Sequence, residues 1–233
     1  MVKINKKTIL IVGANSSIGK VVINAFLNQN YSITATTSKK SKIKKDFVNY
    51  VDLDLTSTSS IKNFCEKTKN ERHYDIVIFF SGIIKAKKLS EYSNNDFIDV
   101  MNVNFIGQAI LLKSILNRLS RNSLVIFTSS ISADRGSYDP IYSASKGAIN
   151  SFIKSLLLQS DIKFRVLAIS PGLIKNSSMY NSMPPKNRLK HLNNTPTKKL
   201  MDIDDLSNIL INICSPHWQN INGEIIHLNG GAW

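Results

Sequence analysis

The sequence predicts an α/β fold, doubly wound, with a mostly seven-stranded parallel sheet and helices on both faces. Short and nearly continuous apolar runs, typical of strands buried on both faces of a parallel sheet, alternate with segments whose apolar residues recur at helical spacing. The first apolar run ends in a glycine turn that leads directly into such a helical segment. No internal repeat interrupts the alternation, so we expect one domain over residues 1–233.

Composition narrows the class of protein. The chain has 233 residues, 42% of them hydrophobic, enough for a substantial core. No apolar window is long enough to predict a membrane helix. The two cysteines, Cys65 and Cys214, lie far apart and lack metal-ligand spacing, so we expect no metal site and two free thiols in a reducing cytoplasm.

The formal net charge of +14 admits a nucleic-acid surface or an anionic ligand. A composition generally rich in Lys, Asn and Ile is the favoured explanation, because no alternation of arginine with aromatic residues suggests base stacking. Nucleic acid is therefore not the expected partner.

The first strand is expected at residues 8–12, and the turn after it predicts a phosphate site. Gly13 permits a sharp turn, and Gly19 permits the following helix to approach the sheet. The loop amides and the helix N-terminus then face a phosphate group, as in Rossmann-type dinucleotide folds. A plain strand-to-helix turn is the alternative. The candidate cofactor residues here are Gly13, Asn15, Ser16, Ser17, Ile18 and Gly19.

The second strand, at residues 32–37, suggests which dinucleotide is bound. An acidic residue at its end would hold a ribose 2′-hydroxyl of NAD, and none is present. Thr37, Ser38 and Lys39 stand there instead, and hydroxyl and ammonium groups suit a 2′-phosphate. NADP(H) is therefore preferred and NAD(H) stays open. A solvated loop is the alternative explanation for the lysines that follow.

The third and fourth strands are expected at residues 47–51 and 75–80. The third leads to Asp54 and Leu55, after which Ser57 or Ser59 caps a helix. The fourth ends at Ser81-Gly82, where glycine suits the close approach of a flat ligand. A polar connection covers residues 83–95.

A long helix is expected at residues 97–119, with Asn104 on its apolar stripe. A buried asparagine needs hydrogen-bond partners. Asn104 is therefore either structural or holds a water molecule beside a lysine.

The fifth strand, at residues 124–128, ends in Ser129 and Ser130. Ligands of open parallel sheets bind beyond the carboxyl ends of strands, so these serines lie where chemistry is expected. The sixth strand, at residues 164–169, ends at Ser170-Pro171-Gly172. Residues 175–199 lack periodicity and are expected to form a substrate lid. A helix at residues 202–213, capped by Asp202, and a strand at residues 224–228 complete the fold.

The helix at residues 141–159 carries Tyr142 and Lys146, one turn apart on the same face. A free phenol titrates near pH ~10, and a neighbouring ammonium group is expected to lower that pKa. Such a pair exchanges a proton with an alcohol or carbonyl oxygen. The same spacing also occurs on ordinary solvated helices, so the neighbouring motifs decide its meaning.

Taken together, these motifs resemble the short-chain dehydrogenase/reductase family over essentially the whole chain. Tyr142 and Lys146 look like its catalytic pair, Ser130 like its catalytic serine and Asn104 like its catalytic asparagine. The glycine loop and Asp54-Leu55 are similar to its cofactor and adenine contacts. The resemblance extends the cofactor set to Ser81, Gly82, Tyr142, Lys146, Pro171, Gly172, Ile174 and Asn176.

Several positions depart from the family pattern. Ser17 replaces the middle loop glycine, and Phe79-Phe80 replaces an asparagine-rich pair before Ser81. Asn176 or Ser177 stands where a threonine is usual. The spacing between Ser130 and Tyr142 is shorter than is usual in the family, so Ser129 stays a minor candidate for the catalytic serine.

The resemblance implies an NADP(H)-dependent oxidoreductase that interconverts a carbonyl and a secondary alcohol, with a tyrosine as acid and base. By analogy the substrate is a small or carrier-bound carbonyl such as a 3-oxoacyl thioester, and the assembly a homotetramer or homodimer. Two alternatives stay open. One is a nucleotide-sugar epimerase or dehydratase, and the other a dinucleotide sensor or nucleic-acid-binding module without turnover.

Overall fold

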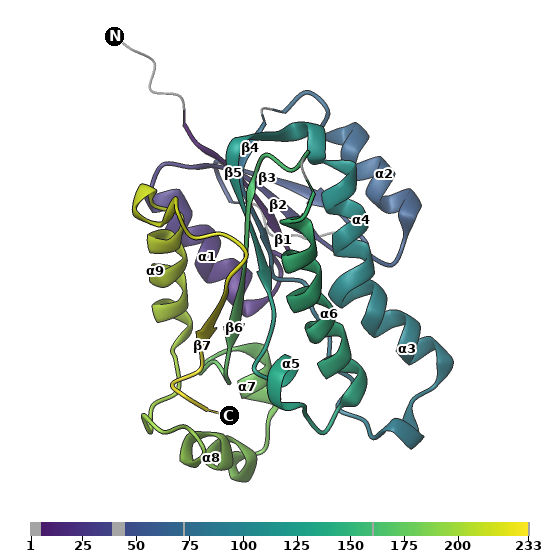
Figure 1. Ribbon diagram of the computed structural model, residues 1–233, viewed down its shortest axis with the longest axis vertical. Coiled ribbons are helices and arrows are strands. Elements are labelled where there is room, and N and C mark those ends of the chain that lie inside the picture. Colours follow the sequence, from purple (N-terminus) through teal and green to yellow (C-terminus); the bar gives the residue numbers. More distant parts are fainter. Residues whose placement is uncertain (1–5, 39–44, 72, 160, 233) are drawn as a thin grey trace.

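The computed structural model describes residues 6–38, 45–71, 73–159 and 161–232. Seven strands form one sheet in the order β3-β2-β1-β4-β5-β6-β7, and every neighbouring pair is parallel (Figure 1). The doubly wound fold class is thereby confirmed. The strands are β1 (Thr8–Val12), β2 (Ser32–Thr37), β3 (Val48–Asp52), β4 (Tyr74–Phe79), β5 (Leu119–Thr128), β6 (Arg165–Pro171) and β7 (Ile225–Leu228).

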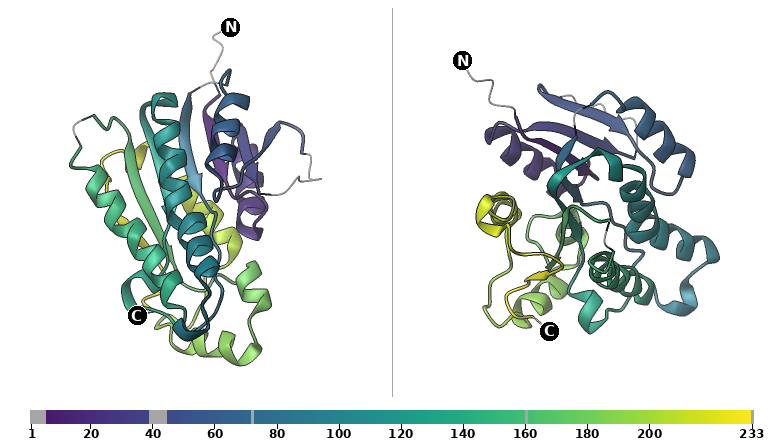
Figure 2. Two further views of the ribbon diagram at one scale, coloured as in Figure 1. Left: turned by 90° about the vertical axis from the view of Figure 1, so that its right-hand side faces the viewer. Right: turned by 45° about the horizontal axis from the view of Figure 1, so that its top comes forward.

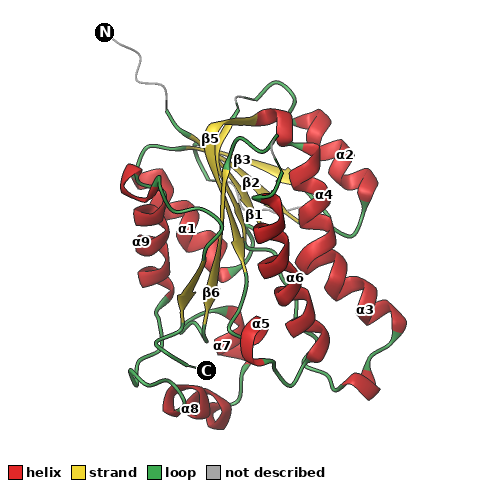
Figure 3. Ribbon diagram, in the orientation of Figure 1, coloured by secondary structure: helices red, strands yellow, loops and turns green. Residues whose placement is uncertain are grey.

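Helices cover both faces of this sheet, as Figures 1 to 3 show from three directions. Helices α1 (Ser17–Asn28) and α9 (Ile203–Ile213) pack on one face. Helices α2 (Thr58–Lys67), α4 (Gly107–Ser114) and α6 (Pro140–Leu156) pack on the other. The alternation within β1 shows why both faces are apolar. Ile9 and Ile11 enter the first core, and Leu10 and Val12 enter the second.

The long helix expected at residues 97–119 is present, with other bounds and with one irregular turn. It runs through α3 (Asn94–Met101), a π-helical turn (Asn102–Ile106) and α4, and residue 119 already belongs to β5. The turn inserts an extra residue at Asn104, whose side chain is fully buried and hydrogen-bonds to the backbone of Ile83. A wider turn at such a position is typical of functional sites in helices.

The segment at residues 175–199 contains two short helices, α7 (Ser178–Ser182) and α8 (Pro185–Asn193). Neither helix contains a buried residue, and this explains why the sequence here needs no strong apolar periodicity. A further turn of helix, α5 (Ser132–Arg135), follows β5. Two expected caps are confirmed, since Ser57 accepts a hydrogen bond from Ser60 N and Asp202 accepts one from Asp204 N.

Cys65 and Cys214 are both free thiols, as expected. Across the described ranges, none of the helices has the length and apolar character needed to cross a membrane.

Candidate active site

Tyr142 and Ser130 meet at the carboxyl end of β5. Tyr142 lies in the first turn of α6 and is buried, and the Ser130 side chain lies close enough to lower the pKa of its phenol. The Ser130 hydroxyl oxygen also accepts from Ser132 N at 3.1 Å. Ser129 points elsewhere, because its hydroxyl donates to Asn150 Oδ1 at 2.6 Å. The structure therefore places Ser130, and not Ser129, beside Tyr142.

Lys146 lies one helical turn behind Tyr142, as its spacing predicts. Its Nζ atom donates to the carbonyl oxygen of Thr128 at 2.7 Å and lies 5.9 Å from the centre of the Tyr142 ring. The side chain is almost fully buried, and this desolvation lowers the pKa of Lys146 to about 8. Lys146 can therefore both hold and release a proton near neutral pH.

The expected effect of Lys146 on the phenol is not what the structure shows. Burial raises the pKa of Tyr142, the neighbouring Ser130 side chain lowers it by less, and the charge of Asp139 adds to the rise. The ammonium group of Lys146 donates to the Thr128 carbonyl oxygen, and burial is the largest influence on the phenol pKa. The phenol is accordingly held in its protonated form, which is the form that a proton donor needs.

Asn104 joins the end of β4 to helix α6. Its Oδ1 atom accepts from Ile83 N at 2.8 Å, and its Nδ2 atom donates to Ile83 O and to Ser145 Oγ, both at 2.9 Å. Ser145 in turn donates to the carbonyl oxygen of Tyr142 at 2.7 Å. These bonds match the structural interpretation of Asn104. The alternative role, holding a water molecule beside Lys146, stays a prediction.

The burial of Lys146 leads to a prediction about stability. Lowering its pKa from 10.5 to about 8 corresponds to a cost on the order of 3 kcal/mol for keeping the ammonium charged in the folded protein at neutral pH. Lys146→Met should therefore raise the free energy of unfolding at pH 7 by about 1–2 kcal/mol, since the lost bond to Thr128 offsets part of the gain. Urea unfolding measures this change.

The lowered pKa of Lys146 also determines how the stability of the protein changes with pH. Unfolded chains keep this proton up to about pH 10.5, whereas the folded protein releases it from about pH 8. Wild-type stability therefore rises between these values, and the advantage of Lys146→Met shrinks over the same range. Lys154→Met, on the exposed side of the same helix, is the control and should change little. A variant at 146 that is less stable than wild type at pH 7 would contradict this account.

The glycine loop after β1 has the close packing that its sequence predicts. Gly13 has a φ of +91°, and a Cβ atom there would lie 2.7 Å from Ser81 N. A Cβ atom at Gly19 would lie 2.7 Å from the carbonyl oxygen of Gly13, so α1 packs directly on the loop. Ser16 caps α1, because its hydroxyl accepts from Gly19 N at 2.9 Å. Backbone atoms and the Ser81 hydroxyl group, 2.8 Å from a Cβ atom built at Gly13, therefore line the point where β1 and β4 end side by side.

Ser17 connects this loop to the segment at residues 175–199. Its hydroxyl oxygen accepts from Ser178 N at 2.9 Å and from Ser178 Oγ at 3.2 Å. Ser178 is the first residue of α7. The serine that replaces the family's middle glycine thus contacts the expected lid, a contact between positions 161 residues apart in sequence.

The other predicted cofactor residues lie past the carboxyl ends of β2, β3, β4 and β6. Thr37 ends β2 and Ser38 follows it, exposed, whereas Lys39 lies outside the described residues. Asp54 and Leu55 follow β3, and the Asp54 carboxylate accepts from the backbone and hydroxyl of Thr56. The remaining members are Ser81, Gly82, Pro171, Gly172, Ile174 and Asn176.

The two candidates for the usual threonine after β6 are both engaged within the chain. Asn176 has a φ of +65°, and its Nδ2 atom donates to Asp202 Oδ2 at 3.0 Å. Ser177 caps α7, with its hydroxyl accepting from Tyr180 N at 3.1 Å. Their side chains therefore shape the start of the lid segment, and the bond to a nicotinamide amide stays a prediction.

The residues present fit a dinucleotide along this edge. Among the described residues, Thr128 Oγ1, Ser170 Oγ and Asn229 Nδ2 are buried polar atoms without a partner, at or just past the ends of β5, β6 and β7. Unsatisfied buried groups of this kind are rare and commonly mark a ligand or water site. Gly82 has no side chain, and a Cβ atom built at this position would lie 3.4 Å from Lys146 Nζ.

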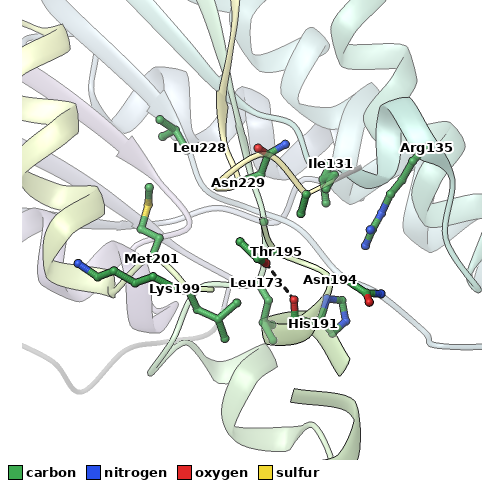
Figure 4. Close-up of a pocket in the computed structure, with 13 residues that line it drawn as sticks. Ile131, Arg135, Leu173, His191, Asn194, Thr195, Lys199, Met201, Leu228 and Asn229 are labelled. Atoms are coloured by element: carbon green, nitrogen blue, oxygen red, sulfur yellow. Dashed lines mark hydrogen bonds between the residues drawn. The ribbon is translucent and has the colours of Figure 1, made fainter. Parts of the chain in front are cut away.

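A cavity opens between the ends of β6 and β7 and helix α8 (Figure 4). Its apolar wall includes Leu173, Met201 and Leu228, and the cationic side chains of Arg135 and Lys199 reach its rim. His191 also lines it, and burial, followed by the charges of Arg135 and Lys190, lowers the pKa of this imidazole. Ile131, the residue after Ser130 in the sequence, also lines the cavity, whereas the side chains of Ser130 and Tyr142 do not.

Two residues at the site were missed from the sequence. Asp139 caps α6, and Ser145 joins Asn104 to Tyr142. The Asp139-Pro140 pair carries the ordinary signal of a helix start, an acidic cap followed by proline, and could have been recognised. Ser145 carries no such signal, because its role depends on the π-helical turn that brings Asn104 to it.

Comparisons with known proteins agree with this geometry. The family model described as "Enoyl-(Acyl carrier protein) reductase" matches residues 13–232. The chain is 32% identical, over 99% of both chains, to a protein named 3-oxoacyl-[acyl-carrier-protein] reductase from Buchnera aphidicola subsp. Baizongia pistaciae. A second relative of that name, from subsp. Schizaphis graminum, is 30% identical over 99% of both chains.

Solved structures give the same picture of the fold. A short-chain dehydrogenase/reductase from Brucella melitensis superposes with a TM-score of 0.88 at 25% identity, covering 97% of this chain and 96% of that one. A 3-ketoacyl-(acyl-carrier-protein) reductase from the same organism, complexed with NADH, superposes with a TM-score of 0.85 at 20% identity, over 97% and 98% of the two chains. That second likeness shows the fold alone.

Proposed function

Because this chain belongs to the short-chain dehydrogenase/reductase family, we propose that Tyr142 and Ser130 are the groups that act on its substrate oxygen. As a family member, the protein is an oxidoreductase of carbonyl compounds that depends on a nicotinamide dinucleotide. The dinucleotide, when bound, supplies or accepts the hydride. The observation that carries the proposal is the placement of Ser130 beside the buried phenol of Tyr142, at the carboxyl end of β5.

In the reductive direction, Tyr142 gives its proton to the substrate oxygen as negative charge develops there. Ser130 donates its hydroxyl hydrogen to the same oxygen and stabilises that charge, while its own oxygen stays anchored to Ser132 N. In the oxidative direction the phenolate takes the proton from the alcohol. Each hydroxyl is held by a backbone or side-chain partner, so little reorganisation is needed.

Lys146 is proposed to return a proton to Tyr142 after reduction. A built Cβ at Gly82 lies 3.4 Å from Lys146 Nζ and 3.6 Å from Asn104 Oδ1, so both polar atoms border one space. A water molecule in that space would connect the lysine to the asparagine. The lowered pKa of Lys146, about 8, makes the transfer possible near neutral pH.

NADP(H) is the proposed dinucleotide. The support is the hydroxyl-bearing end of β2, where Thr37 is buried and Ser38 is exposed, and where no acidic side chain stands to hold a ribose 2′-hydroxyl. The proposed phosphate contacts are the loop from Gly13 to Gly19, including the serine hydroxyls within it.

A 3-oxoacyl thioester is the proposed substrate. Its support is the likeness to the two relatives named 3-oxoacyl-[acyl-carrier-protein] reductase, together with the cavity lined by Ile131. That cavity combines an apolar wall with the cations Arg135 and Lys199. We further propose that residues 175–199 close over the substrate, that copies of this chain assemble as a homodimer or homotetramer, and that the compartment is a reducing cytoplasm.

The test is a titration with NADPH and NADH, followed by a carbonyl panel under the dinucleotide that binds more tightly. We expect tighter binding of NADPH and the highest kcat/KM with an acetoacetyl thioester among thioesters, simple ketones and sugar phosphates. Tighter binding of NADH would refute the cofactor preference alone. Preferred turnover of a sugar phosphate would refute the thioester, and an absence of dinucleotide oxidation across the panel would refute the catalytic proposal.

A further inference from the structure

The buried carboxylate of Asp139 joins the catalytic helix to the segment that follows β4. Its side chain is 1% exposed. One oxygen, Oδ1, accepts from Tyr142 N at 2.9 Å and from the Tyr92 hydroxyl at 2.5 Å. The other, Oδ2, accepts from Lys85 N at 3.1 Å and from Ala86 N at 2.9 Å. Four uncharged donors from two parts of the chain therefore share one carboxylate.

This arrangement does more than cap a helix. A helix cap needs a single acceptor, and the bond to Tyr142 N supplies it. The three further bonds come from residues 85–92, which lie more than 45 positions earlier in the chain. Ala86 adopts a φ of +55°, uncommon for a residue with a Cβ atom, and its N–H group points at the carboxylate. The segment is thus bent toward Asp139.

We propose that Asp139 is a positioning residue, which holds Tyr142 in register with the segment at residues 83–92. The segment begins next to Gly82 and Ile83, and Ile83 is already joined to helix α6 through Asn104 and Ser145. Asp139 supplies a second connection between the same two elements. Two connections prevent the helix start from tilting, and a misplacement of about 1 Å costs up to about 100-fold in rate.

The charge of Asp139 adds a measurable signature. The ionisable groups at Tyr142 in the described structure include Asp139 and Lys146 on its own helix, while Tyr92 reaches Asp139 from the neighbouring segment. The negative charge of Asp139 raises the pKa of Tyr142 and so favours the proton-donating form. A purely structural contact would leave this pKa unchanged.

The matched control lies on the same segment. Asp96 binds Lys85 and Lys87 as ion pairs at 3.0 and 2.8 Å, so it also restrains residues 85–87. It accepts from Ser93 N at the start of α3 as well. Asp96→Asn removes a carboxylate charge and a restraint on the same segment without removing a bond to the helix that carries Tyr142.

The experiment compares Asp139→Asn, Tyr92→Phe and Asp96→Asn in the full chain, with NADPH and an acetoacetyl thioester. Asp139→Asn should lower kcat about 10- to 100-fold, leave NADPH affinity nearly unchanged and move the alkaline limb of the reduction profile to lower pH. Tyr92→Phe, which keeps the carboxylate and loses one bond, should lower kcat by about 3- to 5-fold. Asp96→Asn should lower stability without moving the pH limb.

The inference rests on the proposed role of Tyr142, and the outcomes separate the two. If Tyr142→Phe keeps full activity, the proposed function fails. If Tyr142→Phe is inactive while Asp139→Asn matches Asp96→Asn in kcat and pH profile, the inference about Asp139 alone is wrong. Should Asp139→Asn not fold, wild-type kcat in a well-folded Tyr92→Phe would overturn it equally. Hydrogen exchange of the Lys85 and Ala86 backbone amides should be faster in Asp139→Asn. This measurement detects the loosened segment without an activity assay.

Discussion

Tyr142→Phe is expected to lower kcat/KM for carbonyl reduction by about 10²- to 10⁴-fold, the usual contribution of a positioned general acid. The substitution removes one oxygen atom and keeps the ring that packs against Lys146. Ser130 keeps its bond from Ser132 N, so the site around the missing hydroxyl stays in place. Binding of NADPH, followed by fluorescence titration, should therefore be nearly unchanged.

Tyr138 provides the control for this prediction. It precedes Tyr142 by four residues, and 63% of its surface is exposed. Tyr138→Phe removes the same atom from the same stretch of chain, outside the buried site, and should behave as wild type. Turnover near the wild-type rate in Tyr142→Phe would end the assignment of this phenol as the proton donor.

Gly107→Ala is expected to lower the free energy of unfolding by about 3 kcal/mol or more, because overpacking at a backbone contact is costly. Gly107 is the first residue of α4, and a Cβ atom there would lie 2.1 Å from Leu55 O and 2.8 Å from Asn102 O. Both neighbours are backbone atoms that cannot rotate away. Helix α4 must therefore shift from the sheet, and the turn that carries Asn104 must move with it.

Gly147→Ala is the matched control in stability measurements. Gly147 lies inside α6, and the nearest atom to a Cβ there is Ala133 O at 3.9 Å. The methyl group fits, and alanine in a helix interior is expected to raise stability by about 0.5–1 kcal/mol. Urea unfolding of the two variants should give shifts of opposite sign. Wild-type stability in Gly107→Ala would show that α4 yields at this contact without cost.

Local patterns were enough to predict most of the fold. The strands at residues 8–12 and 32–37 match β1 and β2 residue for residue. In β1 the signal is an apolar run buried on both faces, and in β2 it is a run of small and β-branched residues. The caps Ser57 and Asp202 were equally readable, since capping depends on neighbours within three residues. The glycine turn was predicted for the same reason.

Other features depend on contacts between distant parts of the chain. The expected helix at residues 97–119 contains a π-helical turn at Asn102–Ile106, where the Asn104 side chain bonds to Ile83, 21 positions away. The expected lowering of the Tyr142 pKa did not appear, because burial raises this pKa, and Lys146 Nζ donates to Thr128 O. Neither the direction of a lysine side chain nor the degree of its burial can be obtained from spacing along one helix.

The amino-acid sequence by itself determined the order of strands and helices, the glycine loop and the pairing of Tyr142 with Lys146 on one helical face, since all of these follow from periods of two to four residues. Tertiary structure alone decided that Ser130 and not Ser129 meets the phenol, that Ser17 contacts Ser178, and that Asp139 gathers donors from residues 85–92. The physical reason is that burial and hydrogen-bond partners belong to the packed sheet edge as a whole, where segments far apart in sequence desolvate and orient one another.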